Sequence, residues 1–153
     1  MRRDLGQPVP LQHWPAPVRP LPFTLDQAPD IHCLLTLGYR GGSGSVPDYR
    51  HWLMAFEHDP EFDTDLCFVA QDDQGPVGVI TCWTSAFIKD LVVHPRARRK
   101  GVAMALLTHL FGHLRQRGEA CVDLLVMENN LSARRLYEKS DMSYIRRSAI
   151  EQE

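Results

Sequence analysis

Residues 88–107 of the chain read IKDLVVHPRARRKGVAMALL. An apolar run ends at His94-Pro95, four basic residues follow around Ala97, and Gly101 opens a long pattern of apolar residues at helical spacing. Proline cannot donate a hydrogen bond to a strand ladder, whereas apolar residues three and four positions apart are typical of an amphipathic helix. The stretch therefore predicts a strand, a basic turn and the start of a helix.

The turn between this predicted strand and helix is suited to binding an anion. The first N–H groups of a helix have no intrahelical partner, and the helix dipole makes that end positive. Gly101 has no Cβ and lets the backbone approach a ligand closely. The same point is surrounded by Arg96, Arg98, Arg99 and Lys100. The sequence therefore predicts that a di- or triphosphate group binds here.

Two common phosphate-binding loops are absent from the sequence. No Gly-Lys-Ser/Thr follows a glycine loop, and no G-x-G-x-x-G follows the predicted strand. Residues 98–103 form an R-x-x-G-x-A pattern instead. In its position between a strand and a helix, this pattern resembles the acyl-CoA pyrophosphate loop of the GNAT superfamily of N-acyltransferases.

A second motif extends this resemblance. Residues 122–126 are predicted to form the next strand, and residues 128–139 read ENNLSARRLYEK, which resembles the family pattern N-x-x-A-x-x-L-Y-x-K. The two motifs occur in the family's order and at about its spacing. The resemblance covers roughly residues 66–147, and the N-terminal third matches only in outline.

The resemblance implies an α/β (α+β) fold of the GNAT type, with a mixed, mostly antiparallel sheet, a central splay between two strands, and flanking helices. The hydrophobic pattern predicts strands over 66–71, 77–84 and 86–94, with a hairpin turn at 72–75. It predicts helices over 30–39, 47–56 and 102–117, with a flexible glycine-rich connection over 41–45.

The two ends of the chain are less regular. Repeated prolines exclude a helix from the N-terminal region, so residues 1–17 are expected to be an extended Pro-rich segment before a single GNAT domain over 18–153. Residues 18–21 are expected to form an edge strand. A last strand over 144–150 would run almost to the end of the chain. The usual final strand is then missing, donated by a partner subunit in a homodimer, or replaced by an unusual pairing.

The resemblance implies acetyl-CoA as the cosubstrate. In the family, the loop backbone binds the pyrophosphate, and the splayed strand pairs with pantetheine. The positions that correspond are Leu91, Val92, Val93, Arg98, Arg99, Lys100, Gly101, Val102, Ala103, Asn130, Ala133 and Tyr137. For Asn130, helix capping is an additional or a sole alternative role.

The implied reaction is acetyl transfer to an amine of a small molecule, a protein N-terminus or a lysine, by direct attack in a ternary complex. Tyr137 matches the family tyrosine that protonates the thiolate, with a core aromatic role as the alternative. Asp90 is the candidate base for the amine proton, with substrate binding or a plain surface position as alternatives. A glutamate that many members carry shortly before this position is absent.

The acceptor and the chemistry both leave alternatives open. Tyr39, Trp52 and Trp83 are expected to line the acceptor pocket. The missing glutamate, together with Asp141-Met142 in place of the family's glycine and phenylalanine, motivates a second hypothesis. In it, the protein is a catalytically degenerate GNAT-like module that binds acyl-CoA or serves in assembly.

Composition limits the other function classes. The chain has 153 residues, a mass of 17.5 kDa and a net charge of -2, which suits one domain and gives no reason to expect a nucleic-acid partner. No apolar run approaches the ~18 residues of a membrane span, and no apolar stretch of a signal peptide follows Met1, so a cytoplasmic protein is expected. The four cysteines lie in apolar segments without C-x-x-C spacing. They are expected to be buried free thiols, and no metal is expected.

Overall fold

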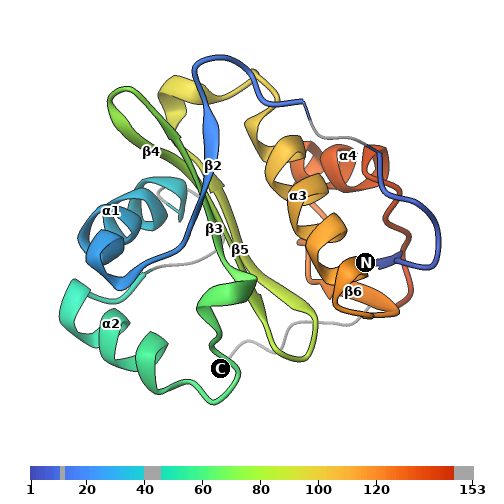
Figure 1. The fold of residues 1–153 in the computed structure, drawn as a ribbon, viewed down its shortest axis with the longest axis horizontal. Helices are drawn as coiled ribbons and strands as arrows, with labels where there is room; N and C mark the ends of the chain where they lie inside the picture. Colours follow the sequence, from blue (N-terminus) through green and yellow to red (C-terminus); the bar gives the residue numbers. More distant parts are fainter. Residues whose placement is uncertain (11–12, 40–45, 147–153) are drawn as a thin grey trace.

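A computed structural model describes residues 1–10, 13–39 and 46–146 of the chain. Its centre is a six-stranded sheet in the order β1-β6-β5-β4-β3-β2 (Figure 1). All neighbouring strands pair antiparallel except β5 and β6, which are parallel. This mixed sheet confirms the predicted fold class. The strands are β1 (Arg2–Asp4), β2 (Arg19–Pro22), β3 (Phe68–Asp72), β4 (Gly75–Trp83), β5 (Phe87–Val93) and β6 (Cys121–Leu124).

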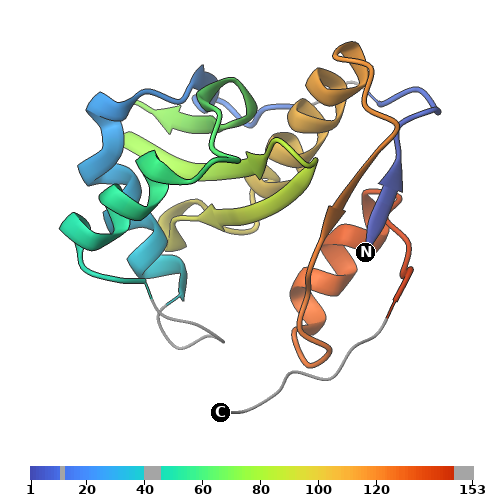
Figure 2. The ribbon, with the colours of Figure 1, turned by 90° about the horizontal axis from the view of Figure 1, so that it is seen from below.

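Helices cover both faces of this sheet. Helices α1 (Ala28–Tyr39) and α2 (Tyr49–His58) lie on one face, and α3 (Val102–Gln116) lies on the other (Figure 1). Helix α4 (Leu131–Lys139) lies beside β6 and β1 (Figure 2). The 3₁₀ turns are η1 (Leu25–Gln27), η2 (Thr64–Leu66) and η3 (Pro95–Ala97). These elements confirm the predicted helices, and the predicted glycine-rich connection over 41–45 lies outside the described residues.

Two hydrophobic cores hold the helices to the sheet. Successive strand residues point to opposite faces. In β4, Val79 therefore enters the core under α1 and α2, and Ile80 enters the core under α3. Side chains such as Leu106 and Phe111 of α3 are almost fully buried. Each such side chain contributes roughly 1.5 to 3 kcal/mol through its removal from water.

Strands β5 and β6 pair over two residues only. Phe87 pairs with Asp123, and Ile88 pairs with Leu124. Beyond these pairs the strands diverge, and Figure 2 shows β6 and β1 standing apart from the other four strands. This divergence matches the expected splay. It leaves the β6-facing edge of residues 89–93 without a strand partner in the described part of the chain.

The sheet edge beyond β6 is occupied by the start of the chain. In β1, Arg3 pairs with Val122 of β6, and Arg2 also forms a bridge to Ser143 on its other side. The expected domain boundary at residue 18 places β1 outside the domain, although β1 is a strand of the domain's sheet. Of the three alternatives for the missing final strand, this is the unusual pairing within one chain. The homodimer stays a prediction.

The predicted last strand is wrong over residues 144–146, which are described and form no strand. Residues 147–150 of the prediction lie outside the described residues. Tyr144 turns back onto α4 instead, where its hydroxyl donates to Glu138 Oε1 at 2.6 Å and accepts from Arg134 Nε at 2.8 Å. These side-chain contacts replace a backbone ladder.

Asp141 and Met142 have structural roles at the end of α4. Asp141 has a φ of 66°, the left-handed conformation that commonly follows a helix C-terminus. The N–H of Met142 donates to the carbonyl oxygen of Tyr137 at 3.0 Å, and the Met142 side chain is buried. Aspartate and methionine thus occupy a left-handed cap and a core position.

The four cysteines are free thiols, as expected, but they are not all buried. Cys67 and Cys82 are buried, and burial raises the pKa of each thiol to about 12. Cys33 is exposed, which corrects the expectation. It lies in an apolar stretch, yet helical periodicity places it off the stripe of Ile31 and Leu34 that faces the core.

Candidate active site

The turn before α3 has an unusual backbone conformation. Arg99 has a φ of 64° and Gly101 a φ of 88°, so two left-handed residues flank Lys100. No atom would lie within 4 Å of a Cβ on Gly101, so the glycine is needed for its conformation rather than for space. Alternating left-handed residues turn successive N–H groups toward one side and form an anion-binding concavity.

The N–H groups of this turn are free to bind a ligand. Among the described residues, no acceptor lies within hydrogen-bond distance of the backbone N–H of Arg99, Lys100 or Gly101. The N–H groups of Val102 and Ala103 belong to the first helical turn, which has no intrahelical acceptor for them. Five consecutive donors therefore lie at the positive end of α3.

The basic side chains of the turn differ in their partners. Arg96 forms a bidentate ion pair with Asp72 of the β3–β4 turn, and the guanidinium lowers the pKa of that carboxyl group. Arg98 Nε donates to the carbonyl oxygen of Val93 at 3.3 Å. No salt bridge is present at Arg98 or Lys100 in the described residues. Their charges are therefore available to an anion, whereas that of Arg96 is neutralised.

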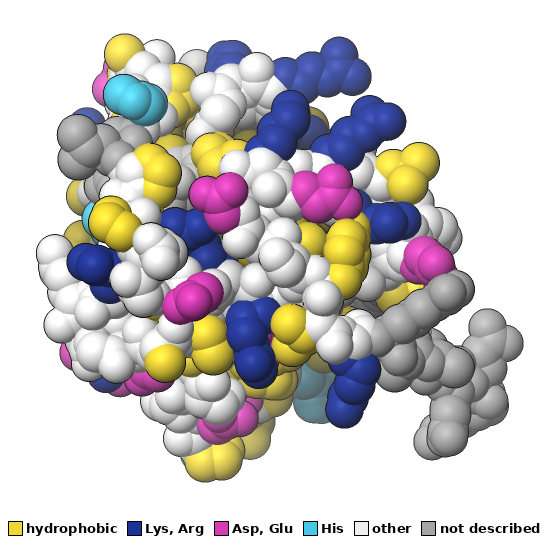
Figure 3. All heavy atoms as spheres, turned by 90° about the vertical axis from the view of Figure 1, so that its right-hand side faces the viewer, with side chains coloured by type: hydrophobic (Ala, Val, Ile, Leu, Met, Phe, Trp, Pro, Cys, Tyr) yellow, Lys and Arg dark blue, Asp and Glu magenta, His cyan; other side chains and the backbone are white. Residues whose placement is uncertain are grey.

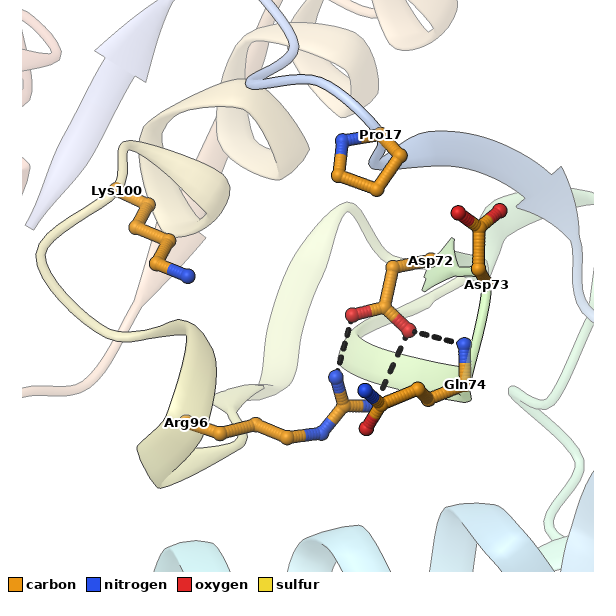
Figure 4. A pocket seen from close by; sticks show the side chains of 6 residues that line it. All are labelled: Pro17, Asp72, Asp73, Gln74, Arg96 and Lys100. Atoms are coloured by element: carbon orange, nitrogen blue, oxygen red, sulfur yellow. Dashed lines mark hydrogen bonds and ion pairs between the residues drawn. The ribbon is translucent and has the colours of Figure 1, made fainter.

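A pocket of about 330 Å³ lies beside this turn. Its lining combines the β3–β4 turn with basic residues and a proline of the N-terminal segment, namely Pro17, Asp72, Asp73, Gln74, Arg96 and Lys100 (Figure 4). Lys and Arg side chains also gather toward the upper part of the face in Figure 3, at the end of the molecule where Figure 1 shows the turn before α3. Two acidic and two basic side chains thus line the pocket itself, and further Lys and Arg side chains gather at this end of the molecule.

The open edge of β5 presents backbone groups to the splay. The N–H of His94 donates to Val77 of β4 at 2.7 Å. Because backbone groups alternate in direction along a strand, those of Val92 also face β4, and those of Leu91 and Val93 face the splay. Val92 pairs with Val79, and its side chain is buried. The expected backbone contact to pantetheine is therefore available at Leu91 and Val93 and not at Val92.

A β-bulge decides which face of the sheet carries Asp90. Thr81 pairs with Asp90, whereas the next residue, Cys82, pairs with Ile88, so Lys89 is the extra residue of a bulge. Directly paired side chains lie on the same face. Asp90 therefore shares the α1 face with Thr81, while Ile88 points into the core under α3.

Asp90 is buried and holds two hydrogen bonds. The Tyr39 hydroxyl donates to Oδ1 at 2.7 Å, and the Thr81 hydroxyl donates to Oδ2 at 2.8 Å. Asp90 is 7% exposed, so a plain surface position is wrong. Burial and the neighbouring Asp90 charge raise the pKa of Tyr39 well above its ordinary value, with a further contribution from Tyr137. Tyr39 of α1, Thr81 of β4 and Asp90 of β5 are thus brought together.

Helix α4 presents the residues of the second motif. Asn130 is its N-cap, with Oδ1 accepting from the N–H of Ala133 at 3.2 Å, so the capping role is present. Tyr137 packs against the core under α3 and stays partly exposed, and burial raises the pKa of its hydroxyl. The side chain therefore stays protonated at neutral pH, as a proton donor must.

Of the three expected pocket residues, Tyr39 and Trp52 belong to the core under α1 and α2, and Trp83 is not part of that core. Trp52 is buried between His32 and Phe56, in an aromatic core beneath α1 and α2. Trp83 stacks on Phe87 at the far end of β4, where the Lys89 ammonium lies 5.8 Å from its ring centroid. Tyr39 is the member that contacts Asp90.

Sequence reasoning missed Thr81, Lys89 and Gly38 as parts of this site. Thr81 is a polar residue in an otherwise apolar run, which is a signal for a buried partner. Lys89 reaches the rings of Phe56 and Trp83 only because of the bulge, and no sequence feature predicts that bulge. Gly38 lies inside α1 next to Tyr39, where a helix interior normally disfavours glycine.

Neither metal ligation nor membrane insertion is indicated by the described part of the chain. No group of three or more His, Cys, Asp or Glu side chains there could hold a metal ion. No helix among residues 1–10, 13–39 and 46–146 is both long and apolar enough to span a membrane.

Residues 29–142 match the acetyltransferase (GNAT) family. The chain belongs to this family. GNAT acetyltransferases are acyltransferases that use acetyl-CoA, so the open edge of β5 and the turn before α3 lie in a fold that binds this cosubstrate. No curated protein sequence matches the chain.

Solved GNAT structures share the fold. A GCN5-related N-acetyltransferase from Sphaerobacter thermophilus superposes with a TM-score of 0.79 and 25% identity over 93% of this chain, which spans only 46% of that protein. A ribosomal-protein-alanine N-acetyltransferase from Brucella melitensis gives a TM-score of 0.68 and 19% identity, over 88% of this chain and 98% of the other. Diaminobutyrate acetyltransferase from Paenibacillus lautus gives a TM-score of 0.64 and 22% identity, over 80% and 73%.

Proposed function

We propose that the protein is an N-acetyltransferase that transfers an acetyl group from acetyl-CoA to an amine, by direct attack in a ternary complex. The observation that carries this proposal is the pair of open backbone surfaces. In the described part of the chain, the N–H groups of Arg99, Lys100 and Gly101 form no backbone hydrogen bond, and the adjoining edge of β5 has no strand partner at the splay. A pyrophosphate joined to an extended amide chain needs donors and a strand edge in this order.

The residues present fit the phosphate end of acetyl-CoA. Backbone N–H groups from Arg99 to Ala103 would bind the pyrophosphate, and the terminal nitrogens of Arg98 would add charge. Each hydrogen bond to a charged group contributes roughly 1.5 to 3 kcal/mol. A few of these are enough for micromolar affinity, which corresponds to about 8 kcal/mol.

The pantetheine arm would lie between β5 and the second motif. Leu91 and Val93 offer their backbone groups on one side, and Asn130 and Ala133 line the other. Bound acetyl-CoA supplies the thioester whose carbonyl carbon the amine attacks. Hydrogen bonds between the pantetheine arm and β5 would fix the position of the thioester, which lowers the entropic cost of the reaction.

Asp90 would accept the proton that the acceptor must lose. An amine with a lysine-like pKa of ~10.4 is only about one part in 2,500 neutral at pH 7, a deficit of roughly 4.6 kcal/mol. A buried carboxylate on the α1 face of β5 can remove this deficit by taking the proton. Asp90 also attracts the ammonium group before transfer, through its negative charge.

Tyr137 would protonate the leaving thiolate. Its side chain lies on the helix of the second motif, and burial raises the pKa of its hydroxyl. The ammonium loses two protons in all: Asp90 takes the first, and the second, lost as the amine attacks, replaces the proton that Tyr137 gives to the sulfur. The neighbours with amine acceptors, a ribosomal-protein alanine in one and L-2,4-diaminobutyric acid in another, support an amine as acceptor class here.

Calorimetric titration tests the cosubstrate site without knowledge of the acceptor. Acetyl-CoA should bind the wild-type protein at micromolar concentration and should not bind an Arg98→Ala, Gly101→Asp double variant. Absence of binding to the wild type would overturn the proposal. Release of CoA on mixing with amines and peptides then separates an enzyme from a degenerate module, which would bind acetyl-CoA and transfer nothing to any acceptor.

A further inference from the structure

The hydrogen bonds around Asp90 leave it poorly placed to meet an amine directly. Asp90 is 7% exposed, and each of its oxygens already accepts a hydroxyl hydrogen bond. Thr81, the donor to Oδ2, is itself buried. Tyr39, the donor to Oδ1, is partly exposed and lies at the end of α1. Of the three residues in this chain of hydrogen bonds, Tyr39 is therefore the most exposed.

We propose that Tyr39 is a catalytic residue of the acetyl transfer, which passes the proton of the acceptor ammonium to Asp90. This inference rests on the proposed function. In the step, an N–H bond of the ammonium breaks and an O–H bond forms at the Tyr39 oxygen, while the original Tyr39 O–H bond breaks and an O–H bond forms at Asp90 Oδ1. The products are a neutral amine and a neutral Asp90 carboxyl group. After product release, the carboxyl group returns its proton to water along the same path.

Tyr39 is suited to passing a proton and not to storing one. Burial and the Asp90 charge raise the pKa of its hydroxyl, so a lasting phenolate is unfavourable. A concerted exchange avoids the phenolate, because Asp90 takes one proton as the amine supplies another. The hydrogen bond of 2.7 Å between Tyr39 and Asp90 is short enough for this exchange.

Gly38 positions Tyr39 by letting α1 approach β5 closely. A Cβ on Gly38 would lie 2.2 Å from Cγ1 and 2.9 Å from Cγ2 of Val92, closer than real atoms come. Any side chain at position 38 would push α1 away from β5. Val92 lies two residues from Asp90, so the same displacement would lengthen the hydrogen bond from Tyr39. Gly38 is therefore a positioning residue that acts through Tyr39.

Acceptor basicity separates proton transfer from mere positioning. Tyr39→Phe should leave acetyl-CoA affinity unchanged and lower transfer to a simple alkylamine about 10²-fold, the lower end of general acid–base effects. Trifluoroethylamine is neutral at physiological pH, so Tyr39→Phe should acetylate it at nearly the rate at which the wild-type protein acetylates the same amine. Transfer to the alkylamine should also recover as the pH rises toward the pKa of that amine. An equal loss with both amines, or no loss, would overturn the inference.

Matched variants make the result specific. Tyr144→Phe removes the same atom from an exposed tyrosine that contacts Glu138 and Arg134, and it should change neither rate. Asp90→Asn should slow the alkylamine as Tyr39→Phe does, and the double variant should be no slower than either, because the two residues act as one unit. Multiplied losses would overturn the relay.

A second readout needs no acceptor. In urea unfolding, the midpoint shifts of Tyr39→Phe and Asp90→Ala should sum to more than the shift of the double variant, because each single variant removes the hydrogen bond between Tyr39 and Asp90. Additive shifts would show that the bond is absent in solution and would overturn the inference. A wild type that binds acetyl-CoA but acetylates no amine would instead overturn the proposed function, and the relay with it.

Discussion

The buried guanidinium of Arg3 donates a hydrogen bond to the carbonyl oxygen of Ser140, and the two atoms lie 3.2 Å apart. The same guanidinium lies 5.2 Å from the centroid of the Phe111 ring. One side chain thus joins β1 to the end of α4 and to α3. The contact ties the second motif to the rest of the sheet, since α4 itself has no fully buried residue.

Arg3→Ala is expected to lower the free energy of unfolding by about 2 to 3 kcal/mol, because it removes a charge-assisted hydrogen bond and a cation–π contact. Urea denaturation measures the change. Arg2→Ala is the matched control, because Arg2 is exposed and pairs with Asp123 at 2.7 Å. Such a pair contributes at most about 1 kcal/mol. Equal losses in the two variants would contradict the role of Arg3.

The left-handed cap after α4 predicts a glycine preference at Asp141. Asp141→Gly should be more stable than Asp141→Ala by about 1 to 2 kcal/mol, the cost of a Cβ in this conformation. Both variants lose the ion pair to Arg3, so its contribution cancels in the comparison. Thermal unfolding of the two variants decides the point, and the prediction fails if they melt at the same temperature.

Gly101→Ala is expected to weaken acetyl-CoA binding by about tenfold, because the added Cβ strains the left-handed backbone by about 1 to 2 kcal/mol. Calorimetry on Gly112→Ala provides the control. Gly112 lies inside α3, and a Cβ added there would have no atom within 4 Å. That change should leave affinity intact and stabilise the helix by up to about 1 kcal/mol. Wild-type affinity in Gly101→Ala would show that the left-handed conformation of this turn does not contribute to acetyl-CoA binding.

Tyr137→Phe is expected to lower kcat by about 10²-fold or more and to leave acetyl-CoA affinity unchanged, because a general acid acts only on the leaving thiolate. Steady-state release of CoA gives the rate once an acceptor is known. A loss smaller than about tenfold would leave Tyr137 with a packing role alone.

His109 predicts a loss of stability in mild acid. Burial lowers the pKa of His109, whose ring lies 4.5 Å from that of Phe68. The unfolded chain, with an ordinary pKa of about 6.5, therefore binds the proton first, and stability falls as the pH drops below about 6.5. Urea denaturation along a pH series should show this slope, and His109→Gln should make it shallower. An unchanged slope in His109→Gln would assign the effect to another group.

The phosphate turn could be predicted because its signal is local. A strand, Pro95, a basic run and Gly101 follow one another in sequence, and each acts on its immediate neighbours. The helix caps and the hairpin were predictable for the same reason. The apolar composition around Cys33 did mislead, because helical spacing places this residue off the one stripe that the helix buries.

The long-range contacts could not be predicted. Tyr39 and Asp90 are 51 residues apart, and their contact depends on how α1 packs on β4 and β5, which no residue type marks. The Pro-rich composition of the N-terminal region indicates only that a helix is excluded. It does not reveal that residues 2–4, which precede the first proline, pair with β6, since this pairing depends on a partner far along the chain.

The place of β1 in the sheet sets an order for assembly. Arg2 and its partner Asp123 are 121 residues apart, so β1 cannot pair with β6 until the chain between them has been synthesised. Closing so long a loop is entropically costly and slow, and it follows the formation of the local hairpins. The second motif is made later still, just after β6. The side of the splay that β6 and α4 form is therefore completed late in folding, when β1 meets β6 and the end of α4.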